Sequence, residues 1–128
     1  MSNESLPSTI FKVRLAASDA HYADNLVSGA KIIDFFHDAA TELLIHHDQD
    51  EGLFRAYESV DFMAPVRSGD FLEIQAKIVK VGNTSRKMEF AAYKVIEARP
   101  TAKNPFAAVT LDPPILCVKA VGTCVVKK

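Results

Sequence analysis

Three acidic side chains recur at intervals of four residues in the first half of the chain. They are Asp34, Asp38 and Glu42. Residues four apart lie on one face of an α-helix, so these carboxylates are expected to form a single stripe. Burial against a partner would raise their pKa values and make one of them a usable general base. The alternative is a solvated outer face, which suits Asp34 better than Asp38 or Glu42.

Four histidines accompany this stripe. His21 precedes it and can donate a hydrogen bond to a carbonyl or orient an acid, although a half-buried structural histidine explains it equally well. His37 adjoins Asp38 and is a weaker candidate. His46 and His47 fit the end of a helix, where a cation complements the helix dipole.

Basic side chains surround a predicted glycine turn at Gly82. The group consists of Lys80, Asn83, Arg86 and Lys87. Such side chains suit a phosphorylated ligand, although a charged hairpin turn in solvent is the competing interpretation. No spacing of histidine, cysteine or carboxylate is typical of a metal site, and no cofactor motif is present.

One long helix, predicted over residues 28–46, must carry the acidic stripe. Its apolar positions repeat at intervals of three and four: Ile32, Ile33, Phe36, Ala40, Leu43 and Leu44. Ser28 and Gly29 suit its capping turn, and the polar run over residues 46–52 ends it.

Strands are predicted on both sides of this helix. A frayed tail over residues 1–9 precedes a strand at 11–16, and four apolar runs of period two follow the helix. Their inward faces are Phe54, Ala56, Val60 and Phe62; Leu72, Ile74, Ala76 and Ile78; Met88, Phe90, Ala92 and Ile96; and Leu116, Val118, Ala120, Cys124 and Val126. Four prolines predict an unpaired loop over residues 99–114.

The order of these elements, one strand, a long helix and then four strands, predicts an α+β fold with a curved antiparallel sheet wrapped round the helix. Apolar residues on the outer face, such as Val79, Val81, Tyr93 and Val125, indicate cover by another subunit.

Composition narrows the function further. The 128 residues suit one domain, and 15 basic against 16 acidic residues give a net charge of −1, which disfavours nucleic acid as the main partner. No apolar run approaches the roughly 18 residues of a membrane span, and the amino-terminal residues do not read as a signal peptide. Cys117 and Cys124 are too far apart along one strand to bridge, so we expect two core thiols and a cytoplasmic protein.

The chain resembles the hot-dog fold in three blocks. These are residues 25–30, residues 60–70 with their Pro-Val-x-x-Gly-Asp turn, and residues 79–85. A closer resemblance, to the β-aminoacyl-CoA ammonia-lyases, rests on residues 19–22, 25–27 and 41–43, on Asp38, and on the Pro-Pro-Ile-Leu-Cys piece at 113–117.

This resemblance implies an enzyme that eliminates ammonia from a short β-aminoacyl-CoA. The favoured substrate is 3-aminobutyryl-CoA, converted to crotonyl-CoA in lysine-type fermentation, although β-alanyl-CoA stays open. Elimination needs a carboxylate to take a proton beside the thioester carbonyl, and a second carboxylate to hold the ammonium. Asp38 and Glu42 are the two candidates, in either order, while His21 assists and the N–H groups near Ser28 and Gly29 stabilise the enolate oxygen. Coenzyme A belongs to the substrate, so no separate cofactor is expected.

Two alternatives stay open, and so does the oligomeric state. An acyl-CoA thioesterase of this kind has a carboxylate about two turns past the helix glycine, where this chain has Phe36. A second departure from that pattern is His21, where a thioesterase has an asparagine ahead of the helix. A non-catalytic CoA-binding subunit would not need the acidic stripe. The resemblance implies a homodimer at least, with a tetramer or hexamer as larger assemblies.

Overall fold

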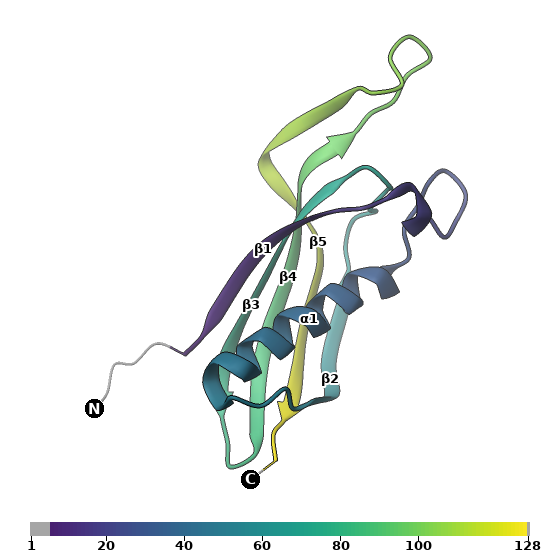
Figure 1. The fold of residues 1–128 in the computed structure, drawn as a ribbon. Helices are drawn as coiled ribbons and strands as arrows, with labels where there is room; N and C mark the ends of the chain where they lie inside the picture. The colour runs from purple at the N-terminus through teal and green to yellow at the C-terminus, as the bar shows by residue number, and fades with distance from the viewer. Residues whose placement is uncertain (1–5, 128) are drawn as a thin grey trace.

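The computed structural model describes residues 6–127, which form one α-helix packed across a five-stranded antiparallel sheet (Figure 1). The strands are β1 (Ser8–Arg14), β2 (Leu53–Phe62), β3 (Phe71–Val81), β4 (Ser85–Ala98) and β5 (Ala108–Val125). The helix is α1 (Gly29–Asp48), and a short 3-10 turn, η1 (Ala17–Asp19), precedes it. The spatial order β1-β3-β4-β5-β2 leaves β1 and β2 at the two edges. The predicted α+β architecture is confirmed.

Helix α1 forms where the apolar period predicted it. Ser28 caps it by accepting a hydrogen bond from the Ala30 N–H at 3.2 Å. It ends at Gln49, whose φ of 55° is left-handed. The buried face toward the sheet comprises Ile32, Phe36, Ala39, Ala40, Leu43 and Leu44.

The prediction of which side chains face inward is confirmed where the strands pair without register shifts. All four apolar positions of β3 are buried, as are Met88, Phe90 and Ala92 of β4. Strand β2 differs, because its pairing with β5 shifts register after Phe54 and again after Tyr57. Each shift changes which side chains point inward, so Ala56 and Phe62 are exposed and the prediction of one alternating face was wrong for this strand.

The predicted amino-terminal tail was wrong for Ser8 and Thr9. Both belong to β1, which pairs antiparallel with β3 from Ser8 opposite Lys77 to Arg14 opposite Phe71. Residues 1–5 of that predicted tail lie outside the described residues.

The predicted loop over residues 99–114 was also wrong in extent. Strands β4 and β5 continue beyond the sheet as a two-stranded hairpin, with Ile96 opposite Thr110 and Ala98 opposite Ala108. Pro113 and Pro114 lie within β5, where the pairing with β4 is irregular. We call residues 95–115 the arm; it projects away from α1 in Figure 1 and carries Phe106, 89% exposed, near its tip.

Several large apolar side chains of the edge strands are exposed, among them Ile10 on β1 and Leu53 and Phe62 on β2. The predicted outer residues Val79 and Val81 of β3 are also exposed. Within residues 6–127, no helix combines the length and apolar character that crossing a membrane requires.

Candidate active site

The segment that leads into α1 is held by backbone hydrogen bonds to the turn before β3. The Val27 N–H donates to the Val66 carbonyl at 2.9 Å, and the Ser68 N–H donates to the Asn25 carbonyl at 2.9 Å. An ion pair of 3.0 Å between Arg67 and Asp24 adds to this connection. The start of the helix is therefore fixed in orientation.

Within the described chain, the first helical N–H, that of Gly29, makes no hydrogen bond. It points out of the helix start and carries the partial positive charge of the helix dipole. The ring of Phe62 lies against Gly29, and a Cβ at this position would overlap the ring as it is placed. The predicted donor near Ser28 and Gly29 is thus available to an oxygen.

An apolar hollow of about 320 Å³ adjoins this helix start. Its side chains are all apolar, including Val27 and Ile32 on one side and Phe62 and Met63 on the other, while backbone groups make part of its surface polar. Met63 is held by donating its N–H to the Cys117 carbonyl at 2.7 Å. Phe62 is 60% exposed, so this wall of the hollow faces solvent in the single chain.

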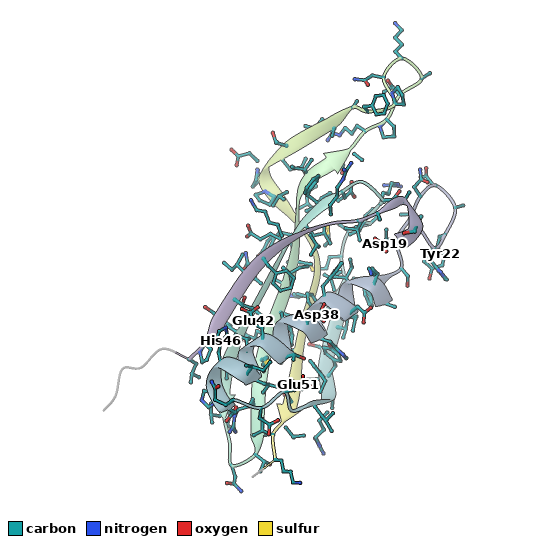
Figure 2. The ribbon with its side chains drawn as sticks, in the orientation of Figure 1. Asp19, Tyr22, Asp38, Glu42, His46 and Glu51 are labelled. Atoms are coloured by element: carbon teal, nitrogen blue, oxygen red, sulfur yellow. The ribbon has the colours of Figure 1, made fainter. Side chains whose placement is uncertain are left out.

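The acidic stripe lies farther along α1 (Figure 2). Glu42 accepts a hydrogen bond from Thr9 Oγ1 at 2.9 Å on one carboxylate oxygen, and its other oxygen is 3.4 Å from His46 Nε2. Its side chain is 44% exposed. Asp38 and Asp34 are exposed. One chain by itself therefore does not bury Asp38 or Glu42, and the burial expected of a general base would have to come from a partner.

Distance along the helix separates the acids from the helix start. Asp38 lies nine residues beyond Gly29, which at about 1.5 Å per residue corresponds to about 14 Å, and Glu42 lies about 20 Å away. The three bonds from a thioester carbonyl carbon to a β-nitrogen span less than about 5 Å. A short aminoacyl group bound at Gly29 therefore cannot touch either acid of the same chain.

His21 lies in the segment before α1, exposed, with its ring 4.6 Å from that of Tyr22 in an edge-on arrangement. Figure 2 shows Tyr22 near the start of the helix, well away from Asp38 and Glu42. One chain therefore does not bring His21 together with the two acids, and its catalytic role stays a prediction.

His37 is on the side of the helix that faces β2. Its ring stacks on that of Phe54 at 4.5 Å, with Tyr57 next in the row. The Tyr57 hydroxyl is buried without a hydrogen-bond partner among the described residues, and burial raises the pKa of Tyr57. His37 is otherwise exposed, so this stacking accounts for one face of its ring.

The basic cluster near Gly82 lies at the opposite end of α1 from Gly29. The hairpin between β3 and β4 is joined to the helix end by Arg86, which contacts Asp48. Lys80 and Asn83 are exposed there, and Lys87 forms an ion pair of 3.1 Å with Glu58. One chain thus places the predicted phosphate-binding residues and the helix start roughly 30 Å apart.

Arg86 does not fit its predicted role in phosphate binding. The residue is 1% exposed, and its guanidinium donates to both oxygens of Asp48 and to the carbonyls of Gly82 and Ser85. Hydrogen bonds from Arg86 hold the pKa of Asp48 at about 2, and the same bonds raise the pKa of Arg86. A guanidinium that is buried and fully used by protein acceptors stabilises the fold instead of binding a ligand.

Asp70, at the end of the Pro-Val-x-x-Gly-Asp turn, is also structural. It is fully buried and accepts hydrogen bonds from the Arg67 and Ala98 N–H groups, each at 2.8 Å. The buried Lys94 ammonium lies 3.4 Å from it and 3.1 Å from Glu97. These contacts explain why the turn requires an aspartate, and they give Asp70 no part in catalysis.

Sequence reasoning missed two side chains that contact Glu42. Thr9 was assigned to a tail, and His46 was assigned only to the helix dipole. The i, i+4 spacing of Glu42 and His46 was a usable signal, whereas the contact with Thr9 joins residues 33 apart and had none.

Comparison with known proteins identifies the family. A profile described as the thioesterase superfamily matches residues 24–98. The chain belongs to this superfamily. The position of Phe36, fully buried and stacked on Phe90 at 5.2 Å, shows that this chain lacks a carboxylate where the hydrolytic one was expected.

Two relatives match nearly the whole chain. The 3-aminobutyryl-CoA ammonia lyase of Acetoanaerobium sticklandii is 52% identical over 94% of this chain and 94% of its own length. The solved structure of the beta-alanyl-CoA:ammonia lyase from Clostridium propionicum superposes with a TM-score of 0.92 at 37% identity, covering 98% of this chain and 88% of that one.

More distant structures share the fold alone. A hexameric hotdog fold thioesterase of Campylobacter jejuni is 20% identical, with a TM-score of 0.70, over 92% of this chain and 81% of that one. Together with the strand order, these matches confirm the expected hot-dog fold.

Proposed function

We propose that this protein eliminates ammonia from a short β-aminoacyl-CoA, with 3-aminobutyryl-CoA as substrate and crotonyl-CoA as product. The observation that carries the proposal is the 52% identity, over 94% of both chains, to a 3-aminobutyryl-CoA ammonia lyase. The match to the beta-alanyl-CoA enzyme supports the same reaction class. We also propose a place in lysine-type fermentation in the cytoplasm, with which the two unbridged thiols are consistent.

The reaction requires three groups around the acyl chain. One carboxylate removes the proton from the carbon next to the thioester carbonyl, and the electron pair forms an enolate. The Gly29 N–H donates to the enolate oxygen. The enolate collapses to the carbon–carbon double bond as the carbon–nitrogen bond breaks, and the ammonium leaves as ammonia. A second carboxylate holds the ammonium until then. Asp38 and Glu42 fill these two roles, and coenzyme A is part of the substrate.

The reaction site requires two copies of the chain. Gly29 lies about 14 Å along the helix from Asp38, too far for one short acyl group to contact both in one copy. We therefore propose that the helix start of one subunit faces the acids of its partner. We also propose that Lys80 and Asn83, which are exposed at the hairpin between β3 and β4, contact coenzyme A bound at another subunit's helix start. The exposed apolar residues of the edge strands and of the arm support a homo-oligomer, a dimer at least.

Mixing two inactive variants tests the reaction and the shared site together. Gly29→Val would place a side chain against Phe62 and block the helix start, whereas Asp38→Asn would remove a carboxylate. Each variant alone should release ammonia from 3-aminobutyryl-CoA at least a hundredfold more slowly than the wild type. Unfolding and refolding them together should restore about a quarter of the wild-type activity in a dimer, because half of the dimers then contain one intact site. Absence of recovery in a correctly assembled mixture would rule out the shared site.

Thioester hydrolysis is the second candidate, because the superfamily contains thioesterases. The buried Phe36 at the position expected for a carboxylate disfavours it. A thiol reagent distinguishes the two reactions, because hydrolysis releases free coenzyme A and elimination does not. Rapid thiol release, without ammonia and without the ultraviolet absorbance of an enoyl thioester, would overturn the lyase proposal. Binding of coenzyme A without turnover of either substrate would favour a non-catalytic subunit.

A further inference from the structure

The apolar hollow beside Gly29 has no role in the reaction as described above. It measures about 320 Å³ and is lined by apolar residues alone, with Val27, Ile32, Val66 and Val118 forming its buried walls. We propose that it receives the substituent on the β-carbon of the substrate and so selects 3-aminobutyryl-CoA over β-alanyl-CoA. This inference rests on the proposed function.

The first step concerns position. If the thioester oxygen accepts a hydrogen bond from the Gly29 N–H, the β-carbon is two bonds from the carbonyl carbon. Gly29 itself lines the hollow, so the groups on the β-carbon lie at its mouth. The β-carbon of 3-aminobutyryl-CoA carries an ammonium and a methyl group, and that of β-alanyl-CoA carries only the ammonium.

The second step concerns which of the two groups enters. An ammonium moved into a site that has no carboxylate loses its hydration, and the backbone carbonyls that line the hollow replace only part of it. None of the side chains that line the hollow is charged or polar. The ammonium therefore points away from the hollow, toward the carboxylates, and the methyl group points into it. A buried methyl group gains the free energy of leaving water.

The third step concerns rigidity. Val27 and Val66 are joined by the backbone hydrogen bond between them, and Ile32 and Val118 are buried in the core. A wall held in this way does not collapse when the methyl group is absent, so β-alanyl-CoA leaves the hollow unfilled. One methyl group in such a pocket typically changes kcat/KM by about 10-fold to 200-fold.

The experiment compares kcat/KM on the two CoA esters for variants of the hollow. Ala64 is half-buried and lines it. In Ala64→Leu, the added side chain should occupy the space and lower the ratio of kcat/KM for 3-aminobutyryl-CoA to that for β-alanyl-CoA at least tenfold. The matched control Ala102→Leu places the same side chain at an exposed position of the arm, and it should leave the ratio unchanged.

A second variant covers the case in which Ala64→Leu does not fold. Val66→Ala enlarges the hollow and should raise kcat/KM for 3-aminopentanoyl-CoA, relative to 3-aminobutyryl-CoA, at least fivefold. If each folded variant releases ammonia but keeps the wild-type value of its own kcat/KM ratio, the inference is overturned and the proposed function still stands. Failure of the wild-type protein to release ammonia from any of these esters would overturn the proposed function, and the inference with it.

Discussion

Arg86 holds Asp48 through both carboxylate oxygens, with Nε 2.9 Å from Oδ2 and Nη2 2.7 Å from Oδ1. The pair joins the end of α1 to the hairpin between β3 and β4, two segments 38 residues apart. Arg86 is buried, so its charge has left water and depends on this partner.

Removing the arginine should therefore destabilise the fold. We expect Arg86→Met to lower the free energy of unfolding by about 3 kcal/mol, because Asp48 is left in place without its cation. Lys87→Met is the matched control; its ion pair with Glu58 is exposed, and we expect a loss of less than about 1 kcal/mol. Urea unfolding measures both values, and equal losses would contradict the structural role of Arg86.

The same pair predicts a pH dependence. The pKa of Asp48 is about 2 in the folded protein, against 3.8 ordinarily, so the folded state favours the charged form. The resulting stabilisation, about 2 kcal/mol, is fully present above about pH 4 and is lost as the pH falls toward 2. The free energy of unfolding, measured between pH 5 and pH 2, should show this loss. Asp48→Asn should remove the corresponding part of the pH dependence. An unchanged pH dependence in that variant would assign the effect to other groups.

Of Asp38 and Glu42, it is Glu42 whose carboxylate contacts two neighbouring side chains, those of Thr9 and His46. We expect Glu42→Gln to reduce kcat by several orders of magnitude without loss of folding, because an amide cannot accept the proton or balance the ammonium. Thr9→Val removes only the hydrogen bond that orients the carboxylate, and we expect about a tenfold loss. Ser8→Ala alters the exposed neighbour and serves as control. Near-normal turnover by folded Glu42→Gln would remove this residue from the mechanism.

The two cysteines should be inert in the native protein. Burial raises the pKa of Cys124 to about 12 and also raises that of Cys117, so the reactive thiolate is scarce near neutral pH. A chromogenic disulfide reagent at pH 8 should modify neither thiol within minutes and both after unfolding in guanidinium. Fast modification of the native protein would show that this part of the core opens readily.

Lys80 provides a test of coenzyme A binding at the hairpin. We expect Lys80→Glu to weaken coenzyme A binding about tenfold at low ionic strength, with a smaller difference at high salt because ions screen the phosphate charge. Lys12→Glu makes the same charge change at an exposed position of β1 and should have little effect. Calorimetric titration measures both, and equal affinities would place the phosphates elsewhere.

Local pattern predicted the elements whose residues interact with near neighbours. The helix follows from apolar residues three and four apart, and the inward face of β3 follows from strict alternation; both patterns are set by backbone geometry alone. The same reasoning failed at β2, where two register shifts reverse the alternation without any signal in the sequence. It also failed at the arm, because the pairing of residues 96–98 with 108–110 continues past prolines in an irregular stretch.

The candidate site likewise has features that a local pattern predicts and features that it does not. Residue spacing was enough to predict that Asp38 and Glu42 share a helix with Gly29 at its start, since spacing fixes the faces of a helix. Three other contacts are visible only in the folded chain: Arg86 is buried against Asp48, Thr9 orients Glu42, and the ring of Phe62 packs against Gly29. Each of these contacts joins residues more than 30 positions apart. Packing of whole elements brings such residues together, and no local pattern records it.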